Sequence, residues 1–324
     1  MSFVHLHCHS HYSLLDGLPT PEAYLKQARE HGSKAMAITD HGALYGAVEF
    51  YKAAKELDIK PIIGIEAYTA ATSRFAKQAG IDNQIGHLIL LARNKKGYEN
   101  LMALSSRAQI EGFYYKPRLD WELLREYGEG LVLLTGCLNG DIPKALLGSR
   151  EDRAEELLGI FKEAVGAENV YMELQHHPQL MEQNILNEKL IRFSERTRTP
   201  LVATNDCHCI LPQDREAHDI LLCVQTGSKV QDESRFKMEG EFYMRSPEEM
   251  ARSFSHIPEA VSNTLAIAEQ CSVELHLKGK PILPVFNTPF NKKDPDYFRE
   301  LCEEGVKKRY GDPVPEEATE RLTY

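Results

Sequence analysis

The sequence lacks the features of a membrane protein, a secreted protein or a disulfide-rich scaffold. Its 324 residues contain no apolar run near the ~20 residues that a membrane-spanning helix needs. The first ten residues, MSFVHLHCHS, lack the basic and apolar segments of a secretory signal, so we expect the chain in the cytoplasm. The cysteines are odd in number, seven from Cys8 to Cys302, and do not form a disulfide framework.

Positive charge is also scarce. The 38 Lys and Arg residues face 48 Asp and Glu residues, which gives a net charge of -10. Nonspecific nucleic-acid binding depends on cationic side chains that neutralise phosphates, so this balance argues against such binding by the chain alone. A phosphate-bearing substrate would need a local positive charge such as a metal ion. The 42% hydrophobic share is enough for a sizeable core, and the length allows two domains or one large barrel.

Short runs of Val, Ile and Leu alternate with stretches of helical periodicity, which is typical of successive strand-helix units. Seven parallel strands with outer helices indicate an α/β fold of the barrel type, with its chemistry at the C-terminal ends of the strands. The expected strands are 3–8, 34–40, 61–69, 87–93, 131–137, 170–175 and 201–207. The expected helices are 20–32, 44–57, 97–110, 153–165, 182–197 and 215–224.

The alternation fades after Thr226. Two more helices are expected from Ser246 and from Ile257, and prolines from Pro281 to Pro295 then indicate an extended connector. We therefore expect a barrel with C-terminal helices over 1–285 and a connector with the start of another region over 286–324. Helical patterns at 297–310 and 316–324 are too short to fold alone, which predicts a fragment of a longer protein.

Histidines concentrate at the start of the chain, at positions 5, 7, 9 and 11. On a strand, a spacing of two places His7 and His9 on one face, where two imidazoles can begin a metal site. The alternative is a hydrogen-bonded histidine pair without metal. For His5 and His11 we expect supporting or solvent-facing roles.

Other expected strands also contain or end in possible metal ligands, His, Asp or Glu. Their sequences there are ITDHG, GIEA, QHHP and TNDCH. Strand ends converge in a barrel, so these side chains would meet. The candidates exceed what one ion uses, which predicts two or three divalent ions, zinc, manganese or magnesium, and phosphoester hydrolysis as their chemistry. The candidate ligands are His7, His9, Asp16, His41, Glu66, His87, His177, Asp206 and His208.

These motifs resemble those of the PHP (polymerase and histidinol phosphatase) superfamily, which has a distorted seven-stranded barrel. The matching motifs are HCH with Ser13 and DG, then TDHG, Glu66 and DCH. Longer stretches such as HSHYSLLDG and VATNDCH resemble the N-terminal region of bacterial DNA polymerase III alpha subunits. The resemblance covers essentially the whole chain, and its last forty residues resemble the entry into the polymerase palm region. It implies that the nine candidates hold three ions. Of two adjacent histidines, only the resemblance selects His177 over His176.

The resemblance also implies a function. Members with the full ligand set are associated with a metal-dependent 3′-5′ exonuclease that proofreads DNA, for which Asp206, His208 and His9 are the candidate catalytic residues. The expected partners are the primer 3′ end, the rest of the polymerase subunit and other replisome subunits. The polymerase aspartates would lie beyond residue 324. Three alternatives remain: a pyrophosphatase, a metal-stabilised docking module without turnover, and a small-molecule phosphatase similar to histidinol phosphatase.

Several other residues are weaker candidates. Lys116 and Arg118 are the candidates for contact with substrate phosphates, although a solvated turn is the competing interpretation. Cys207 and Cys209 flank His208, a pattern that would suit a thiolate zinc site if the two sulfurs did not point away from the histidine. Asp40 is expected to support a ligating histidine. Three further histidines lie away from the expected strand ends and receive no catalytic role: His218, His256 and His276.

Overall fold

The computed structural model describes residues 2–277 and 283–324, which form two compact units, Met1–Leu275 and His276–Tyr324. Pro281 lies outside the described residues. The expected boundary near residue 285 falls within the second unit, so the division into 1–285 and 286–324 stays a prediction. In the described part of the chain, no helix combines the length and apolar character that crossing a bilayer requires.

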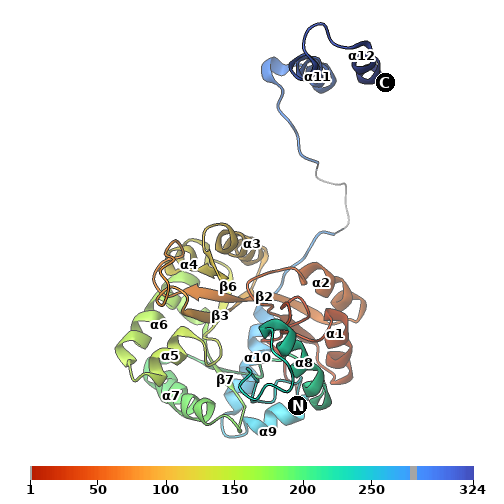
Figure 1. The fold of residues 1–324 in the computed structure, drawn as a ribbon. Helices are drawn as coiled ribbons and strands as arrows, with labels where there is room; N and C mark the ends of the chain where they lie inside the picture. Colours follow the sequence, from red (N-terminus) through yellow and green to blue (C-terminus); the bar gives the residue numbers. More distant parts are fainter. Residues whose placement is uncertain (1, 278–282) are drawn as a thin grey trace. The chain divides into compact units, whose positions relative to one another are not determined.

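The first unit contains one eight-stranded sheet surrounded by helices, in the order β4-β5-β2-β3-β6-β7-β8 with β1 paired to β2 (Figure 1). This confirms the α/β class and the curled, barrel-like sheet, and six of the seven expected strands are present. The strands β4 and β5 were not expected. The strands are β1 (Ala35–Ile38), β2 (Lys60–Ala70), β3 (Ile85–Ala92), β4 (Phe113–Tyr114), β5 (Lys116–Leu119), β6 (Leu131–Leu134), β7 (Val170–Gln175) and β8 (Leu201–Thr204).

The expectation that all strands run parallel was wrong for β3. This strand is antiparallel to both of its neighbours, β2 and β6, whereas the pairs β1 with β2, β6 with β7, and β7 with β8 are parallel. A parallel return requires a crossover, usually a helix, but residues 71–84 between β2 and β3 contain only turns and bends. The chain therefore folds back on itself, and the first residues of β3 lie at the edge where its neighbours end.

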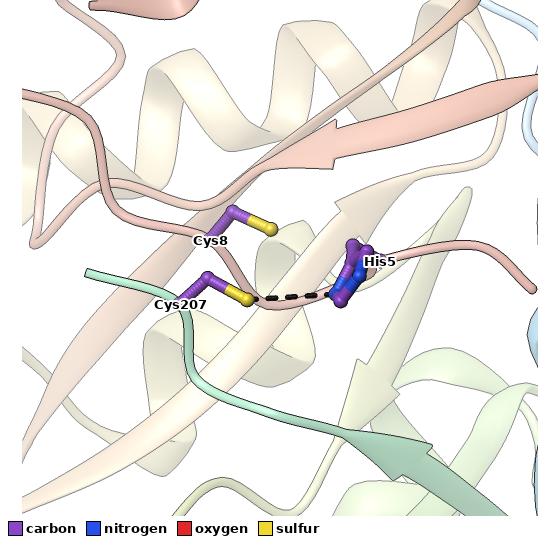
Figure 2. Close-up of side chains that lie close together, drawn as sticks. All are labelled: His5, Cys8 and Cys207. Carbon is purple, nitrogen blue, oxygen red and sulfur yellow. Dashed lines mark hydrogen bonds between the residues drawn. The ribbon is translucent and has the colours of Figure 1, made fainter. Parts of the chain in front are cut away.

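Residues 3–8 do not form the expected strand. The segment is extended and lies between β1 and the turn after β8: Ala37 N–H donates to the His5 carbonyl at 2.8 Å, and Cys207 N–H donates to the His7 carbonyl at 3.1 Å. A single bridge pairs Cys8 with Cys207, and their side chains lie side by side (Figure 2). This segment completes the barrel between β1 and the turn after β8 without a full ladder of strand hydrogen bonds. We call this junction the seam.

Helix starts follow their sequence signals. The Thr20 hydroxyl accepts a hydrogen bond from Ala23 N–H at the start of α1, and Ser246 forms a capping box with Glu249 at the start of α9. One short helix, α5, was not predicted. The helices of the first unit are α1 (Pro21–Glu30), α2 (Ala47–Glu56), α3 (Lys95–Ile110), α4 (Trp121–Tyr127), α5 (Asp141–Leu147), α6 (Glu151–Val165), α7 (Met181–Thr197), α8 (Arg215–Thr226), α9 (Pro247–Ser253) and α10 (Pro258–Gln270).

The inner strands are apolar on both faces. All four residues of β6 are fully buried, as are Leu88 to Ala92 of β3, because helices cover one face of the sheet and the barrel interior covers the other. This packing fixes the strand ends, from which polar side chains emerge. The second unit consists of α11 (Asp294–Tyr310) and α12 (Glu316–Thr323), and α11 buries none of its residues.

Two helical glycines predict opposite effects on stability. A Cβ at Gly97 in α3 would lie 1.9 Å from the backbone oxygen of Gly130, whereas a Cβ at Gly159 in α6 would meet no atom within 4 Å. We expect Gly97→Ala to lower the free energy of unfolding by about 2 kcal/mol or more. Gly159→Ala should raise it by about 0.5 to 1 kcal/mol through helix propensity. Urea denaturation monitored by circular dichroism measures both, and equal effects of the two substitutions would refute this packing.

Candidate metal centre

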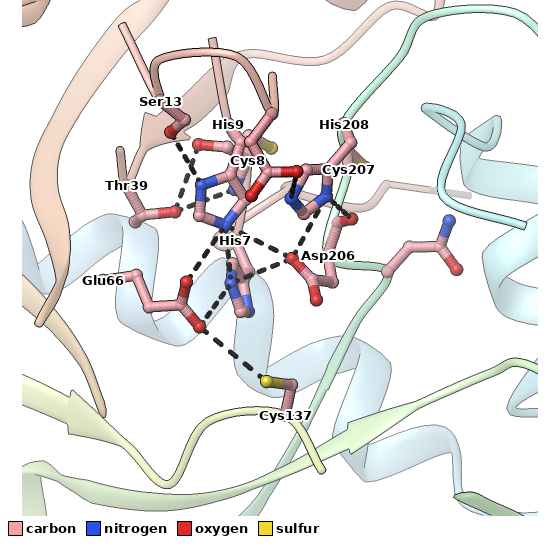
Figure 3. Close-up of polar contacts among 12 residues, drawn as sticks. His7, Cys8, His9, Ser13, Thr39, Glu66, Cys137, Asp206, Cys207 and His208 are labelled. Carbon is pink, nitrogen blue, oxygen red and sulfur yellow. Dashed lines mark hydrogen bonds and ion pairs between the residues drawn. The ribbon is translucent and has the colours of Figure 1, made fainter. Parts of the chain in front are cut away.

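Eight of the nine predicted ligands meet at one edge of the sheet. Figure 3 labels five of them, His7, His9, Glu66, Asp206 and His208. The antiparallel direction of β3 explains the position of His87, which is the third residue of its strand and lies opposite Tyr68, two residues after Glu66 on β2. We call this group the strand-end cluster. It comprises His7, His9, Asp16, His41, Glu66, His87, Asp206 and His208.

Four side chains in the cluster surround one point. Nε2 of His7 lies 3.0 Å from Nε2 of His9, and these two atoms lie 3.1 and 3.3 Å from Oδ1 of Asp206. Each imidazole nitrogen is also 3.5 Å from an oxygen of Glu66. Zinc bound at about 2.0 to 2.1 Å holds tetrahedral ligand atoms roughly 3.3 Å from one another. All four side chains are buried, and Oδ1 of Asp206 has no hydrogen-bond partner, so the donor set fits a divalent cation.

Two further groups share atoms with the first. Nδ1 of His87 lies 2.9 Å from Oε1 of Glu66, and Sγ of Cys137 lies 3.6 Å from that nitrogen and 3.8 Å from that oxygen. On the other side, His41 lies between Glu66 at 2.6 Å and Asp16 at 2.9 Å, and His208 is 3.7 Å from Asp16. Since Nδ1 of His41 has no hydrogen bond despite its short contact with Glu66, this group also suits a cation.

Burial and charge shift the pKa values of the cluster strongly. Burial, followed by the proximity of His41 and His208, lowers the pKa of His9 to about 3. Burial lowers the pKa of His7, but the nearby carboxylates of Asp206 and Glu173 outweigh this effect, so the pKa of His7 is raised. Burial also opposes charge on Asp206, but the neighbouring His7 and His208 hold the pKa of this carboxyl well below its usual range. Ionised carboxylates in a buried site call for a compensating positive charge, which divalent ions supply.

Buried hydrogen bonds orient the ligands. Nδ1 of His7 donates to Oε1 of Glu173 at 2.6 Å, and Glu173 also accepts hydrogen bonds from the Thr204 hydroxyl and Gly136 N–H. Glu173 was not predicted, although it alternates with apolar residues on a buried strand. On the opposite side, Asp40 accepts a hydrogen bond from Ser13, whose Oγ lies 2.9 Å from Nδ1 of His9. The expected supporting role of Asp40 is therefore consistent with its contacts.

The turn after β8 presents residues to two sides. Asp206 has a φ of +48°, a left-handed conformation that is uncommon for a non-glycine residue. Asp206 and His208 face the cluster, whereas Cys207 turns away to within 3.5 Å of Nδ1 of His5. Among the described residues, Cys209 belongs to no group that could hold a metal ion. The thiolate pattern of Cys207, His208 and Cys209 therefore does not form.

His177 belongs to none of the compact donor groups formed by the described residues, although it interacts with Asp206 and His208, so its role as a ligand stays a prediction. Its ring packs on Phe242 at 4.4 Å, both of its nitrogens lack hydrogen-bond partners, and burial lowers its pKa to about 4. Cys137, which was not predicted, occupies the position beside Glu66 and His87. Cys137 follows β6 as an isolated residue and gave no sequence signal.

Arg118 was wrong as a candidate for phosphate contact. It is fully buried, and its guanidinium donates hydrogen bonds to the backbone carbonyls of Gly112, Asp82, Arg74 and Ala76. It stabilises loops and offers no donor to a substrate.

Lys116, by contrast, is exposed and lies 5.3 Å from the ring of Tyr68, which stacks on His41. It stays a candidate. His218 lies closer to the cluster than expected: its ring is 5.6 Å from that of His208, and its Nε2 donates to the Asp16 carbonyl at 2.8 Å.

Comparisons with known proteins identify relatives of this chain. A family model described as the PHP domain matches residues 5–177. The chain is 46% identical over 314 residues to the DNA polymerase III subunit alpha of Borreliella burgdorferi, covering 95% of this chain and 27% of that protein. The corresponding subunit of Treponema pallidum is 44% identical over 328 residues, covering 100% of this chain and 28% of that protein. The chain thus spans less than a third of the length of these relatives.

Among solved structures, a candidate metal-dependent phosphoesterase from Bifidobacterium adolescentis is similar at a TM-score of 0.41 and 14% identity. The similarity covers 78% of this chain and 96% of that chain.

The contacts of Cys137 and His177 predict different effects on metal content. We expect Cys137→Ala to reduce the ions retained per chain after dialysis, because it removes a donor beside Glu66 and His87. His177→Ala should reduce metal content less, because His177 is in none of the compact donor groups of the described residues. Mass spectrometry of the purified proteins measures the number of metal ions per chain. A loss of metal in His177→Ala with none in Cys137→Ala would show that His177, and not Cys137, is the ligand.

Glu173 should control metal affinity without contacting the metal. Glu173→Gln keeps the size of the side chain but weakens its hydrogen bond with Nδ1 of His7. We therefore expect the affinity for zinc to fall about 10- to 100-fold. Competition with a chromophoric chelator measures this affinity. The control is Glu163→Gln on the surface of α6, where the side chain is 63% exposed. Equal affinities in the two variants would contradict this role.

Proposed function

Because this chain belongs to the PHP domain family, we propose that it is the N-terminal PHP domain of a DNA polymerase III alpha subunit and hydrolyses phosphodiester bonds with two or three divalent ions. The observation that carries the proposal is the strand-end cluster. Three buried or nearly buried carboxylates and five imidazoles meet there, in a chain whose net charge of -10 offers little other attraction for phosphate.

Three overlapping donor groups would hold the ions. One is formed by His7, His9, Glu66 and Asp206, a second by Glu66, His87 and Cys137, and a third by Asp16, His41 and His208 with His9 beside them. When bound, divalent ions at such a site lower the pKa of a water molecule and neutralise charge on a phosphoryl group. Imidazole and thiolate donors favour zinc, and the carboxylates also allow manganese or magnesium.

The cluster's own residues supply proton transfer and orientation. Asp206 stays ionised, so its carboxylate can hold an ion through Oδ1 and orient a water beside that ion. His208 uses Nδ1 to donate to the Asp206 carbonyl at 2.8 Å, which leaves Nε2 directed toward Asp16. His9 is held by Ser13 on its other nitrogen. These contacts support the catalytic roles of the three residues.

The substrate that we propose is the 3′ end of a DNA primer, which is removed in the 3′-5′ direction as a proofreading step in the cytoplasm. The similarity to polymerase subunits supports a DNA substrate. Lys116 and the 73%-exposed Tyr115 lie on one short hairpin, where a cation and an aromatic ring can contact a single strand. Pyrophosphate, the product of polymerisation, is the second candidate because the same donor groups suit it. The proposed protein partners are the rest of the same polymerase subunit and other replisome subunits.

The proposed exonuclease predicts that Asp206→Asn loses activity. We expect the purified chain with zinc or manganese to shorten a 3′-mismatched primer, and Asp206→Asn to slow this at least about 100-fold. Denaturing gel electrophoresis of a 5′-labelled primer measures the rate, with chelator as the blank. Asp296→Asn, an exposed change in α11, is the matched control.

If metal-loaded protein leaves the primer intact, the exonuclease proposal fails. Release of phosphate from pyrophosphate under the same conditions would then support the second candidate. Absence of both activities would favour a docking role without turnover.

A further inference from the structure

A second group of metal-competent side chains lies behind the strand-end cluster. Nδ1 of His5 and the two sulfurs of Cys8 and Cys207 all lie within 4.8 Å of one another (Figure 2). None of the three side chains is more than 2% exposed. We call this group the buried triad. It contains none of the eight residues of the strand-end cluster, and its donor atoms are softer.

The tautomer of His5 is set for metal binding. Its Nε2 lies 2.8 Å from the Arg245 carbonyl, which can only accept, so Nε2 carries the proton. The lone pair is therefore on Nδ1, which faces Sγ of Cys207 at 3.5 Å. Histidines that bind metals usually donate their other N–H to a carbonyl or carboxylate in this way.

The spacing of the donors also fits a tetrahedral ion. Zinc bonds of about 2.3 Å to sulfur and about 2.0 to 2.1 Å to nitrogen place the two donor atoms roughly 3.5 Å apart. The carbonyl oxygen of Tyr243 lies 3.7 Å from Sγ of Cys207 and offers a fourth donor. Two thiolates offset the charge of one divalent ion, so the complex would be neutral in a buried site.

We propose that His5, Cys8 and Cys207 bind one zinc ion that is separate from the ions of the strand-end cluster. Each thiol releases its proton to solvent as its sulfur binds the metal. Thiolate donors select a soft ion over magnesium or manganese. Because the site is closed to solvent, the ion enters as the barrel closes during folding.

This ion would fasten the seam of the barrel. Cys8 and Cys207 are far apart in sequence but are bridged across the seam, where no continuous strand ladder joins the two segments. Cys8 lies between His7 and His9, and Cys207 lies between Asp206 and His208. An ion held by both cysteines would fix the backbone that positions four ligands of the strand-end cluster.

Cobalt substitution tests the proposal without an activity assay. The starting protein is Cys137→Ser, which removes the thiol beside the strand-end cluster. With cobalt bound, we expect this protein to keep a thiolate-to-cobalt charge-transfer absorption in the near ultraviolet. The absorption should disappear when Cys8→Ser or Cys207→Ser is added and should persist when Cys209→Ser is added. Persistence in both of the first two variants would overturn the site.

X-ray absorption spectroscopy of zinc-loaded Cys137→Ser keeps the test decisive if the double variants fail to fold. A sulfur shell at about 2.3 Å around part of the bound zinc is the expected result. A shell of nitrogen and oxygen alone, with zinc bound, would show that the triad is held only by S–H···N hydrogen bonds and would refute the proposal. Neither spectroscopic result depends on the exonuclease assay, so the two proposals can fail separately.

Discussion

The Glu66 carboxylate connects the whole centre. It is buried and lies within 3.5 Å of four histidines, His7, His9, His41 and His87, which come from three separate segments of the chain. These neighbours outweigh the effect of burial and hold the pKa of Glu66 well below its usual range. A buried negative charge is costly unless positive charge compensates it, so the arrangement depends on cations at this point. Each donor group that we assign to an ion lies beside this carboxylate or next to one of its histidines.

Two features of the backbone bring these residues together. The reversal between β2 and β3 places His87 beside Glu66, which an all-parallel barrel would not do. At the seam, an extended segment with a single bridge brings His7 and His9 to the turn after β8. The left-handed conformation of Asp206 in that turn directs two ligands to one side and Cys207 to the other. The regular strands form a rigid sheet, and the irregular segments at its edge place the ligands close to one another.

The sequence predicted much of this arrangement. Apolar runs identified β1, β2, β3, β6, β7 and β8, and eight of nine candidate ligands meet as expected, because ligands at strand ends must converge in a barrel. Strand direction was not predictable, because local patterns in residues 71–84 do not show where the chain returns. The resemblance alone selected His177 over His176, and Cys137 was missed because its proximity to Glu66 depends on tertiary structure. Arg118 shows the same limit: its charge suggested the surface, but backbone carbonyls hold it in the interior.

The central claim is that the strand-end cluster is a polynuclear metal site. Anomalous X-ray diffraction at the zinc and manganese absorption edges, from crystals grown with these ions, tests it most directly. The account predicts two or three peaks around Glu66, one of them between His7, His9 and Asp206. Absence of anomalous density around Glu66 at saturating metal would contradict the account. The histidines and carboxylates would then be paired only with one another.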